Sequence, residues 1–157
     1  MASLTRNVWW GVLAGAAGTT ALNAVTYLDM AVRGRPASST PQQTIERVSA
    51  LVGVSLPRDK RTKDALESAL GALLGALAGV VAGAALGAVR GLTGQPRNKT
   101  GTIATAWTMA MVVGNGPMTV LGVTDPRQWT SADWAADVLP HVAYAVAAGV
   151  TLEALAD

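Results

Sequence analysis

The chain has 157 residues, of which 50% are hydrophobic and 14% are charged. Soluble domains carry about a quarter charged residues, so this composition argues against an ordinary soluble domain and favours a membrane protein. Cysteine is absent, which excludes disulfides, thiolate metal sites and cysteine catalysis. The net charge of +2 is too small to indicate a nucleic-acid partner, and we expect none.

Four hydrophobic stretches are candidates for helices that cross the lipid bilayer, which requires about 20 residues. They cover residues 8–28, 65–89, 102–122 and 134–156. We therefore predict an all-α fold in which residues 1–157 form one integral membrane domain, a bundle of four transmembrane helices. A cleaved signal peptide is the alternative for the first stretch, but its apolar run is longer than such a segment usually has.

The last two stretches contain residues that interrupt helices. The sequence GNGP at 114–117 predicts a broken helix in the third stretch, because a Gly-Pro pair ends or kinks a helix. In the fourth, Thr130 followed by Asp133 predicts a capped helix start, and Pro140 then falls inside the helix. Both stretches are therefore weaker candidates for complete spans than the second.

The connection between the first two stretches, residues 33–64, has a structure of its own. Thr40 is predicted as an N-cap, with Pro41 at the first helical position and Gln43 completing a capping box. Apolar residues then recur at helical spacing: Ile45, Val48, Leu51 and Val52. This pattern predicts a short amphipathic helix on the membrane surface.

A basic segment, PRDKRTKD at 57–64, follows this helix. Its cations suit anionic lipid headgroups, and they are Arg58, Lys60, Arg61 and Lys63. The alternative is a solvated loop that marks the cytoplasmic side. Eight basic residues on this side of the predicted bundle, against four on the other, predict that both termini lie outside. The Ala/Gly/Arg-rich composition is typical of high-GC bacteria, and we expect a location in the bacterial inner membrane.

Glycine occupies every fourth position in the second stretch, and we call these residues the glycine row: Gly71, Gly75, Gly79, Gly83, Gly87 and Gly91. Residues four apart share one helix face, so the row forms a bare groove that another helix can approach closely. The first stretch has a matching face with Gly11, Gly15, Thr19, Asn23 and Tyr27. We expect a glycine-zipper contact between these two helices. The alternative is a contact within a homo-oligomer or with a partner membrane protein.

Five polar residues lie in or beside the apolar stretches, where polar groups are candidates for function. They are Asn23, Asp29, Asn115, Asp137 and His141. Each has a structural alternative. Asp29 can pair with Arg33 at a helix end, and Asn115 can bridge the broken third helix. His141 can hydrogen-bond Asp137 one turn earlier, and we expect no metal site because the sequence has no second histidine and no cysteine.

Sequence motifs typical of enzymes are missing from the chain. It has no phosphate-binding loop, no G-x-S-x-G and no histidine pair at metal-ligand spacing, so we expect no catalysis and no cofactor. The sequence predicts an oligomeric channel or transporter whose polar residues line a pathway. The second hypothesis is an accessory or assembly subunit that packs through the glycine row. A membrane-embedded enzyme that uses Asp137 and His141 is the least favoured alternative.

Overall fold

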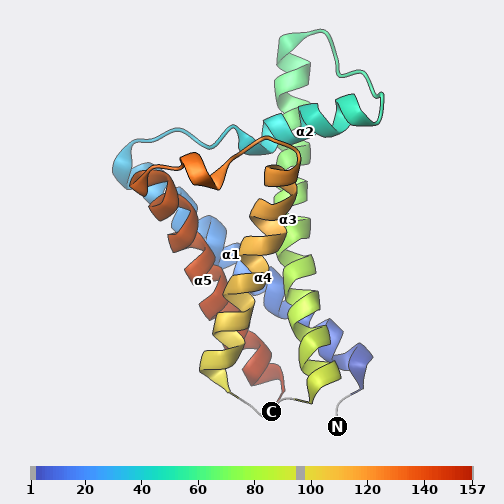
Figure 1. The fold of residues 1–157 in the computed structure, drawn as a ribbon, viewed down its shortest axis with the longest axis vertical. Coiled ribbons are helices and arrows are strands. Elements are labelled where there is room, and N and C mark those ends of the chain that lie inside the picture. Colours follow the sequence, from blue (N-terminus) through green and yellow to red (C-terminus); the bar gives the residue numbers. More distant parts are fainter. Residues whose placement is uncertain (1–2, 95–97, 157) are drawn as a thin grey trace.

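The computed structural model describes residues 3–94 and 98–156, and every regular element in these ranges is a helix. The elements are α1 (Leu4–Arg33), α2 (Thr40–Leu51), α3 (Lys60–Thr93), α4 (Lys99–Val120), the short 3-10 helix η1 (Pro126–Gln128) and α5 (Ser131–Leu155). The four long helices pack in a closed ring in the order α1, α3, α4, α5. Helix α2 lies across one end of this bundle against α3, whereas α1 begins and α5 ends at the opposite end (Figure 1).

Capping residues explain where several helices begin and end. The Asp59 carboxylate accepts a hydrogen bond from a backbone amide in the first turn of α3. The predicted capping box of Thr130 and Asp133 is confirmed at the start of α5. Gly34 and Gly94, with φ of 60° and 59°, end α1 and α3, since glycine enters the left-handed region without a steric penalty.

The predicted start of the amphipathic helix is wrong by one residue. Ser39 is the N-cap of α2 and Thr40 is already helical. Gln43 does not complete a capping box, because its Nε2 donates to Ser39 Oγ at 2.8 Å. Pro41 fits either of the first two helical positions, since neither amide there has a helical acceptor, and its place in the sequence therefore did not fix the cap.

The predicted break in the third stretch is also wrong. Helix α4 runs without interruption through residues 114–117 and ends at Val120. Pro117 lies in the last turn of α4, where its missing N–H removes only the hydrogen bond to the carbonyl of Val113. Pro140 likewise lies inside the continuous helix α5. Asn115 is therefore an ordinary helical residue and does not bridge a break.

Two of the described helices, α3 and α5, are long and apolar enough to cross a membrane. Only 22% of the most apolar window of α3 and 39% of that of α5 are buried in the bundle, so most residues of these windows are partly or fully exposed. The core helix of a soluble protein would be mostly buried. The fold is thus all-helical with two candidate spans, whereas the sequence predicted four.

Glycines bring α1 and α3 into contact at their backbones. A Cβ added to Gly83 would lie 2.5 Å from Cα of Gly15, and one added to Gly15 would lie 2.6 Å from the carbonyl oxygen of Gly79. A Cβ added to Gly87 would likewise collide with the backbone carbonyl group of Asn7. Positions that rise in number along α1 meet positions that fall along α3, so the two helices are antiparallel.

Beyond Gly79, toward the end covered by α2, helices α1 and α3 separate. A Cβ on Gly71 would lie 2.7 Å from Cβ of Pro41 in α2, and a Cβ on Gly75 would meet no atom within 4 Å. The glycine row therefore has two parts. Its part from Gly79 to Gly91 packs against α1, whereas Gly71 and Gly75 border a space between the helices.

Tyr144 of α5 is the largest side chain at the point where α1 and α3 separate. It is 1% exposed, and its ring occupies the space beside Gly18, where an added Cβ would lie 2.7 Å from the ring. Its hydroxyl donates to the carbonyl oxygen of Gly79 at 2.6 Å. Tyr144 therefore joins α5 to both helices of the glycine contact.

Candidate functional site

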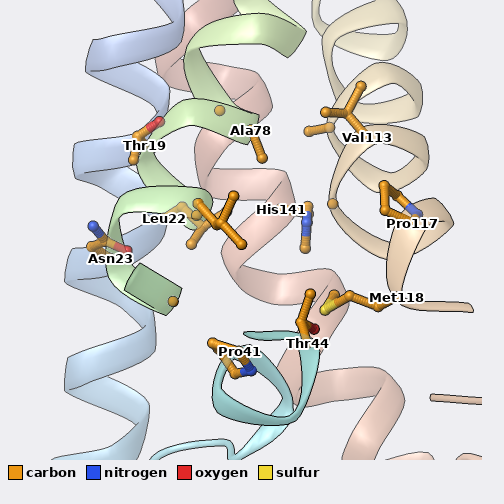
Figure 2. Close-up of a pocket in the computed structure, with 16 residues that line it drawn as sticks. Thr19, Leu22, Asn23, Pro41, Thr44, Ala78, Val113, Pro117, Met118 and His141 are labelled. Carbon is orange, nitrogen blue, oxygen red and sulfur yellow. The ribbon is translucent and has the colours of Figure 1, made fainter. Parts of the chain in front are cut away.

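A pocket of about 290 Å³ lies where α1 and α3 separate. All four long helices contribute to its wall, and Pro41 and Thr44 of α2 close one end (Figure 2). Most of the lining is apolar, and the described lining includes no Asp, Glu, Lys or Arg. The polar side chains in it are Thr19, Asn23, Thr44 and His141. Since Gly75 and Asn23 are exposed, the pocket is open beside them.

His141 extends from α5 into this pocket, between the α1 residues and the α4 residues in Figure 2. Its Nδ1 lies 2.7 Å from the backbone carbonyl oxygen of Asp137. A carbonyl oxygen only accepts hydrogen bonds, so Nδ1 carries a proton, and in the neutral ring Nε2 presents its lone pair. Nε2 lies 3.2 Å from the place of a Cβ at Gly114, so a larger residue at this position would crowd Nε2.

Two other candidate residues stand behind His141. Asn115 of α4 donates from Nδ2 to Oδ2 of Asp137 at 3.0 Å, and the same Oδ2 lies 3.6 Å from Nδ1 of His141. Neither Asn115 nor Asp137 lines the pocket. The structure therefore joins three residues chosen from the sequence into one cluster across α4 and α5, with only the imidazole facing the pocket.

The remaining two candidates have different positions. Asn23 lines the pocket from α1 and is exposed. Asp29 lies outside the pocket lining at the end of α1, where its carboxylate is 2.7 Å from Nε of Arg33 and 2.5 Å from Nε of Arg35. The ion pair of Asp29 with Arg33 is the structural alternative that the sequence offered, and Arg35 adds to it.

Two threonines in the lining were not among the polar candidates, and Thr19 was expected only on the face of the first stretch that matches the glycine row. Thr19 Oγ1 donates to the carbonyl oxygen of Gly15 at 2.8 Å, and Thr44 Oγ1 donates to that of Thr40 at 2.8 Å. Each hydroxyl proton is thus used in a hydrogen bond within its own helix. Only the lone pairs of the hydroxyl oxygen are left to accept a hydrogen bond from an occupant of the pocket. Their spacing carried no signal, because threonine makes this hydrogen bond in many helices.

A second polar group, at the end of the bundle away from α2, was also missed. Arg90 Nη1 of α3 donates to Glu153 Oε1 of α5 at 2.8 Å, and Thr102 Oγ1 of α4 donates to the same oxygen at 2.6 Å. Glu153 is 2% exposed. A cavity of about 440 Å³ lies beside this group. The ion pair ties three helices together, and only the folded bundle brings its members to one place.

Helix α2 is held over the pocket by charged residues. Lys63 of α3 forms an ion pair with Glu46 of α2, and its Nζ also lies 3.5 Å from Oε1 of the buried Glu67. The hydrogen bond from Lys63 lowers the pKa of Glu46, and the same bond raises the pKa of Lys63. Of the four cations expected to meet lipid headgroups, Lys63 is thus paired with a carboxylate of α2, whereas Arg58, Lys60 and Arg61 are exposed and have no such pair among the described contacts.

The chain matches no protein-family model, and neither a curated protein nor a solved structure is significantly similar to it. Within residues 3–94 and 98–156, no group of three or more His, Asp or Glu side chains is placed to hold a metal ion. The site is therefore interpreted from its own geometry.

Proposed function

We propose that the protein is a small four-span membrane protein with a channel-like or transporter-like role, in which the pocket beside His141 is part of the pathway. The observation that carries this proposal is the pocket itself, whose wall includes residues from every long helix. It contains Asn23 and His141, and His141 is linked to Asn115 and Asp137. Polar side chains within a membrane-spanning bundle are typical of solute and ion pathways.

Exposed apolar rows support a membrane environment. Leu73, Leu77 and Val81 recur every four residues on α3 and are 47–65% exposed. Val142, Val146 and Val150 form a similar row on α5 and are 44–48% exposed. Apolar patches of this kind are rare on soluble monomers, and lipid would cover them in a bilayer. In the proposal, α1 and α4 cross as well: Asn7 and Asn115 are buried, and the exposed Thr20 and Thr108 donate to backbone carbonyl oxygens of their own helices.

The positions of the glycine contacts bear on how copies would assemble. Helix α1 already occupies the space beside Gly79, Gly83 and Gly87, and α2 occupies the space beside Gly71. An oligomer of the kind expected for a pathway protein would thus use the exposed outer rows of α3 and α5. The alternative of an accessory subunit that binds its partner through the glycine row is less favoured, because only Gly75 is left open and it borders the pocket.

The proposal is tested by asking whether the pocket can be reached from both sides of a bilayer. Single cysteines replace Ala78 in the pocket wall and Ala148 in the core, and the chain has no native cysteine to interfere. The protein is reconstituted into vesicles with one orientation, and a small membrane-impermeant methanethiosulfonate is added outside or enclosed inside. We expect Ala78→Cys to react from both sides, and Ala148→Cys, the matched control at 0% exposure, from neither.

Reaction of Ala78→Cys from one side only would contradict a pathway. It would instead indicate a binding pocket open to that side, as an accessory subunit could have. If Ala78→Cys reacts from neither side, the proposal is contradicted as well, because a solute as large as the methanethiosulfonate could not enter the pocket.

A further inference from the structure

The hydrogen-bonding groups in the pocket are nearly all of one kind. Thr19 and Thr44 each donate to a carbonyl oxygen one turn back in their own helices, so their hydroxyl oxygens offer lone pairs to the pocket. His141 uses Nδ1–H on the carbonyl of Asp137, so neutral Nε2 also offers a lone pair. Of the described lining side chains, only Asn23, at the exposed rim, keeps N–H donors for an occupant.

Because these side chains can accept hydrogen bonds but not donate them, the pocket favours an occupant that has a hydrogen-bond donor. An aldehyde, ketone, ether or ester would leave these lone pairs unsatisfied, and a carboxylate or phosphate would be repelled by them. A hydroxyl group would donate its one proton to one of these lone pairs. Since a buried polar group without a partner costs free energy, the pocket discriminates against occupants that only accept.

The charge of the occupant follows from the rest of the lining. The carboxylate of Asp137 lies behind the imidazole, and it already accepts from Asn115, so no anionic side chain faces the pocket. A cation moved into an apolar pocket without a paired anion would lose its hydration and gain little in return. The pocket therefore suits an uncharged molecule.

The volume of the pocket and its apolar wall indicate what the rest of the occupant, apart from its hydroxyl group, should be. The volume of about 290 Å³ is at the lower limit of pockets that hold small molecules, which run from about 300 to 1,000 Å³. Leu22, Leu74, Val113 and Met118 contribute hydrocarbon or thioether surface. One hydroxyl and a compact hydrocarbon body match this wall.

We infer that the pocket is a binding site for a small uncharged lipophilic alcohol, whose hydroxyl donates to Nε2 of His141. The inference rests on the proposed function for the role of the pocket as a solute site, and it adds the chemical class of the solute. The pocket is open beside Gly75, because a Cβ built there would meet no atom within 4 Å.

Three ligands of nearly equal shape test the inference on the purified protein in detergent: cinnamyl alcohol, its methyl ether and cinnamylammonium. Binding is measured by equilibrium dialysis, with empty micelles as the blank. We expect the alcohol to bind about three- to tenfold more tightly than the ether, the usual worth of one net hydrogen bond. The ammonium ion should bind more weakly than the alcohol. In His141→Leu the alcohol should lose its advantage over the ether.

Two glycine variants show whether binding occurs in this pocket. Gly75→Leu places a side chain in the pocket, whereas Gly116→Leu is the matched control on α4, outside the lining. A Cβ at either position meets no atom within 4 Å, so we expect both proteins to fold. Gly75→Leu should abolish binding of the alcohol and Gly116→Leu should leave it unchanged.

Equal affinity for alcohol and ether in the native protein would overturn the inference, whether or not His141→Leu folds. Tightest binding of the ammonium ion, or no binding of any of the three, would overturn it too. These results are separate from the cysteine experiment. If the pocket binds the alcohol but Ala78→Cys reacts from one side only, the pathway is refuted and the ligand class stands. If Ala78→Cys reacts from both sides but the alcohol does not bind, the ligand class is refuted and the pathway stands.

Discussion

Arg90 on α3 and Glu153 on α5 form a buried ion pair between residues that are 63 positions apart in the sequence, with Nη1 and Oε1 separated by 2.8 Å. Thr102 on α4 donates to the same carboxylate oxygen. A charge that has left water depends on such partners, because solvent no longer compensates it. The end of the bundle where α1 begins and α5 ends is thus joined by charges in addition to the glycine contacts between α1 and α3.

Glu153→Ala should lower the free energy of unfolding by about 3–5 kcal/mol, the usual effect of removing one member of a buried ion pair. The measurement is denaturant unfolding of the protein in detergent, followed by circular dichroism. Arg90→Met combined with Glu153→Leu is the control, and it should be less destabilising than Glu153→Ala because it leaves no unpaired charge. A double variant as unstable as the single one would show that packing, and not charge, is lost.

Two alanine substitutions in the glycine row should have opposite effects. Gly83→Ala puts a methyl group against the backbone of Gly15, where an overpacked contact costs about 1–3 kcal/mol. Gly75→Ala meets open space, so the helix propensity of alanine should stabilise the protein by up to about 1 kcal/mol. Both are measured by thermal unfolding in the same detergent. Equal effects at the two positions would contradict the contact between α1 and α3.

The attachment of α2 should weaken in acid. Lys63 depresses the pKa of Glu46 below its ordinary 4.5, so their ion pair contributes fully above pH 4.5 and is lost as the pH falls through the lower folded value. The raised pKa of Lys63 keeps the pair intact on the alkaline side up to at least its ordinary 10.5. Spin labels at exposed positions Arg47 and Ser68 should therefore separate, in electron-resonance distance measurements, only at acidic pH.

Glu46→Gln is the control for the acid effect. It removes the titrating carboxylate, so the distance between the labels should no longer change over the acidic range. A change that persists in Glu46→Gln would assign the effect to another group, of which Glu67 is the nearest carboxylate to Lys63.

Labelling from outside intact cells should distinguish the two ends of the bundle. Ser39 is the N-cap of α2, Gln128 ends η1 in the connection between α4 and α5, and Thr93 ends α3. Figure 1 shows α2 and the connection between α4 and α5 at one end of the bundle and the end of α3 at the other. By the distribution of basic residues, cysteines at Ser39 and Gln128 should be protected from an impermeant maleimide and a cysteine at Thr93 should react. Labelling of Ser39 in intact cells would reverse the orientation. Opposite results at Ser39 and Gln128 would contradict four spans.

Local chemistry made part of the fold predictable. The capping box of Thr130 and Asp133 involves residues three apart, and its geometry is the same in any helix start. The spacing of the glycines was equally informative, since residues four apart share a face whatever lies opposite. The cap of α2 and the course of α4 past Pro117 were mispredicted, because proline near a helix end is compatible with more than one boundary.

The candidate site was predictable only in part. Asp137 and His141 are one helical turn apart, so their proximity followed from the sequence. The pocket did not, because it exists where α1 leaves α3, and no local pattern marks that point. The place of Thr19 and Thr44 in the pocket lining was not predictable either, because it depends on the same separation of α1 from α3. Arg90 and Glu153 could not be paired in advance, since many arrangements of four helices would keep them apart.

The distance in sequence between Arg90 and Glu153 has a consequence for biosynthesis. Arg90 is translated 63 residues before its partner, whereas all the glycines that join α1 to α3 are complete by residue 91. The pair of α1 and α3 can thus associate while α4 and α5 are still on the ribosome. During that interval the Arg90 side chain lacks the carboxylate of Glu153. Arrival of α5 then inserts Tyr144 beside Gly18 and supplies the carboxylate, so the last helix made completes the bundle at two points.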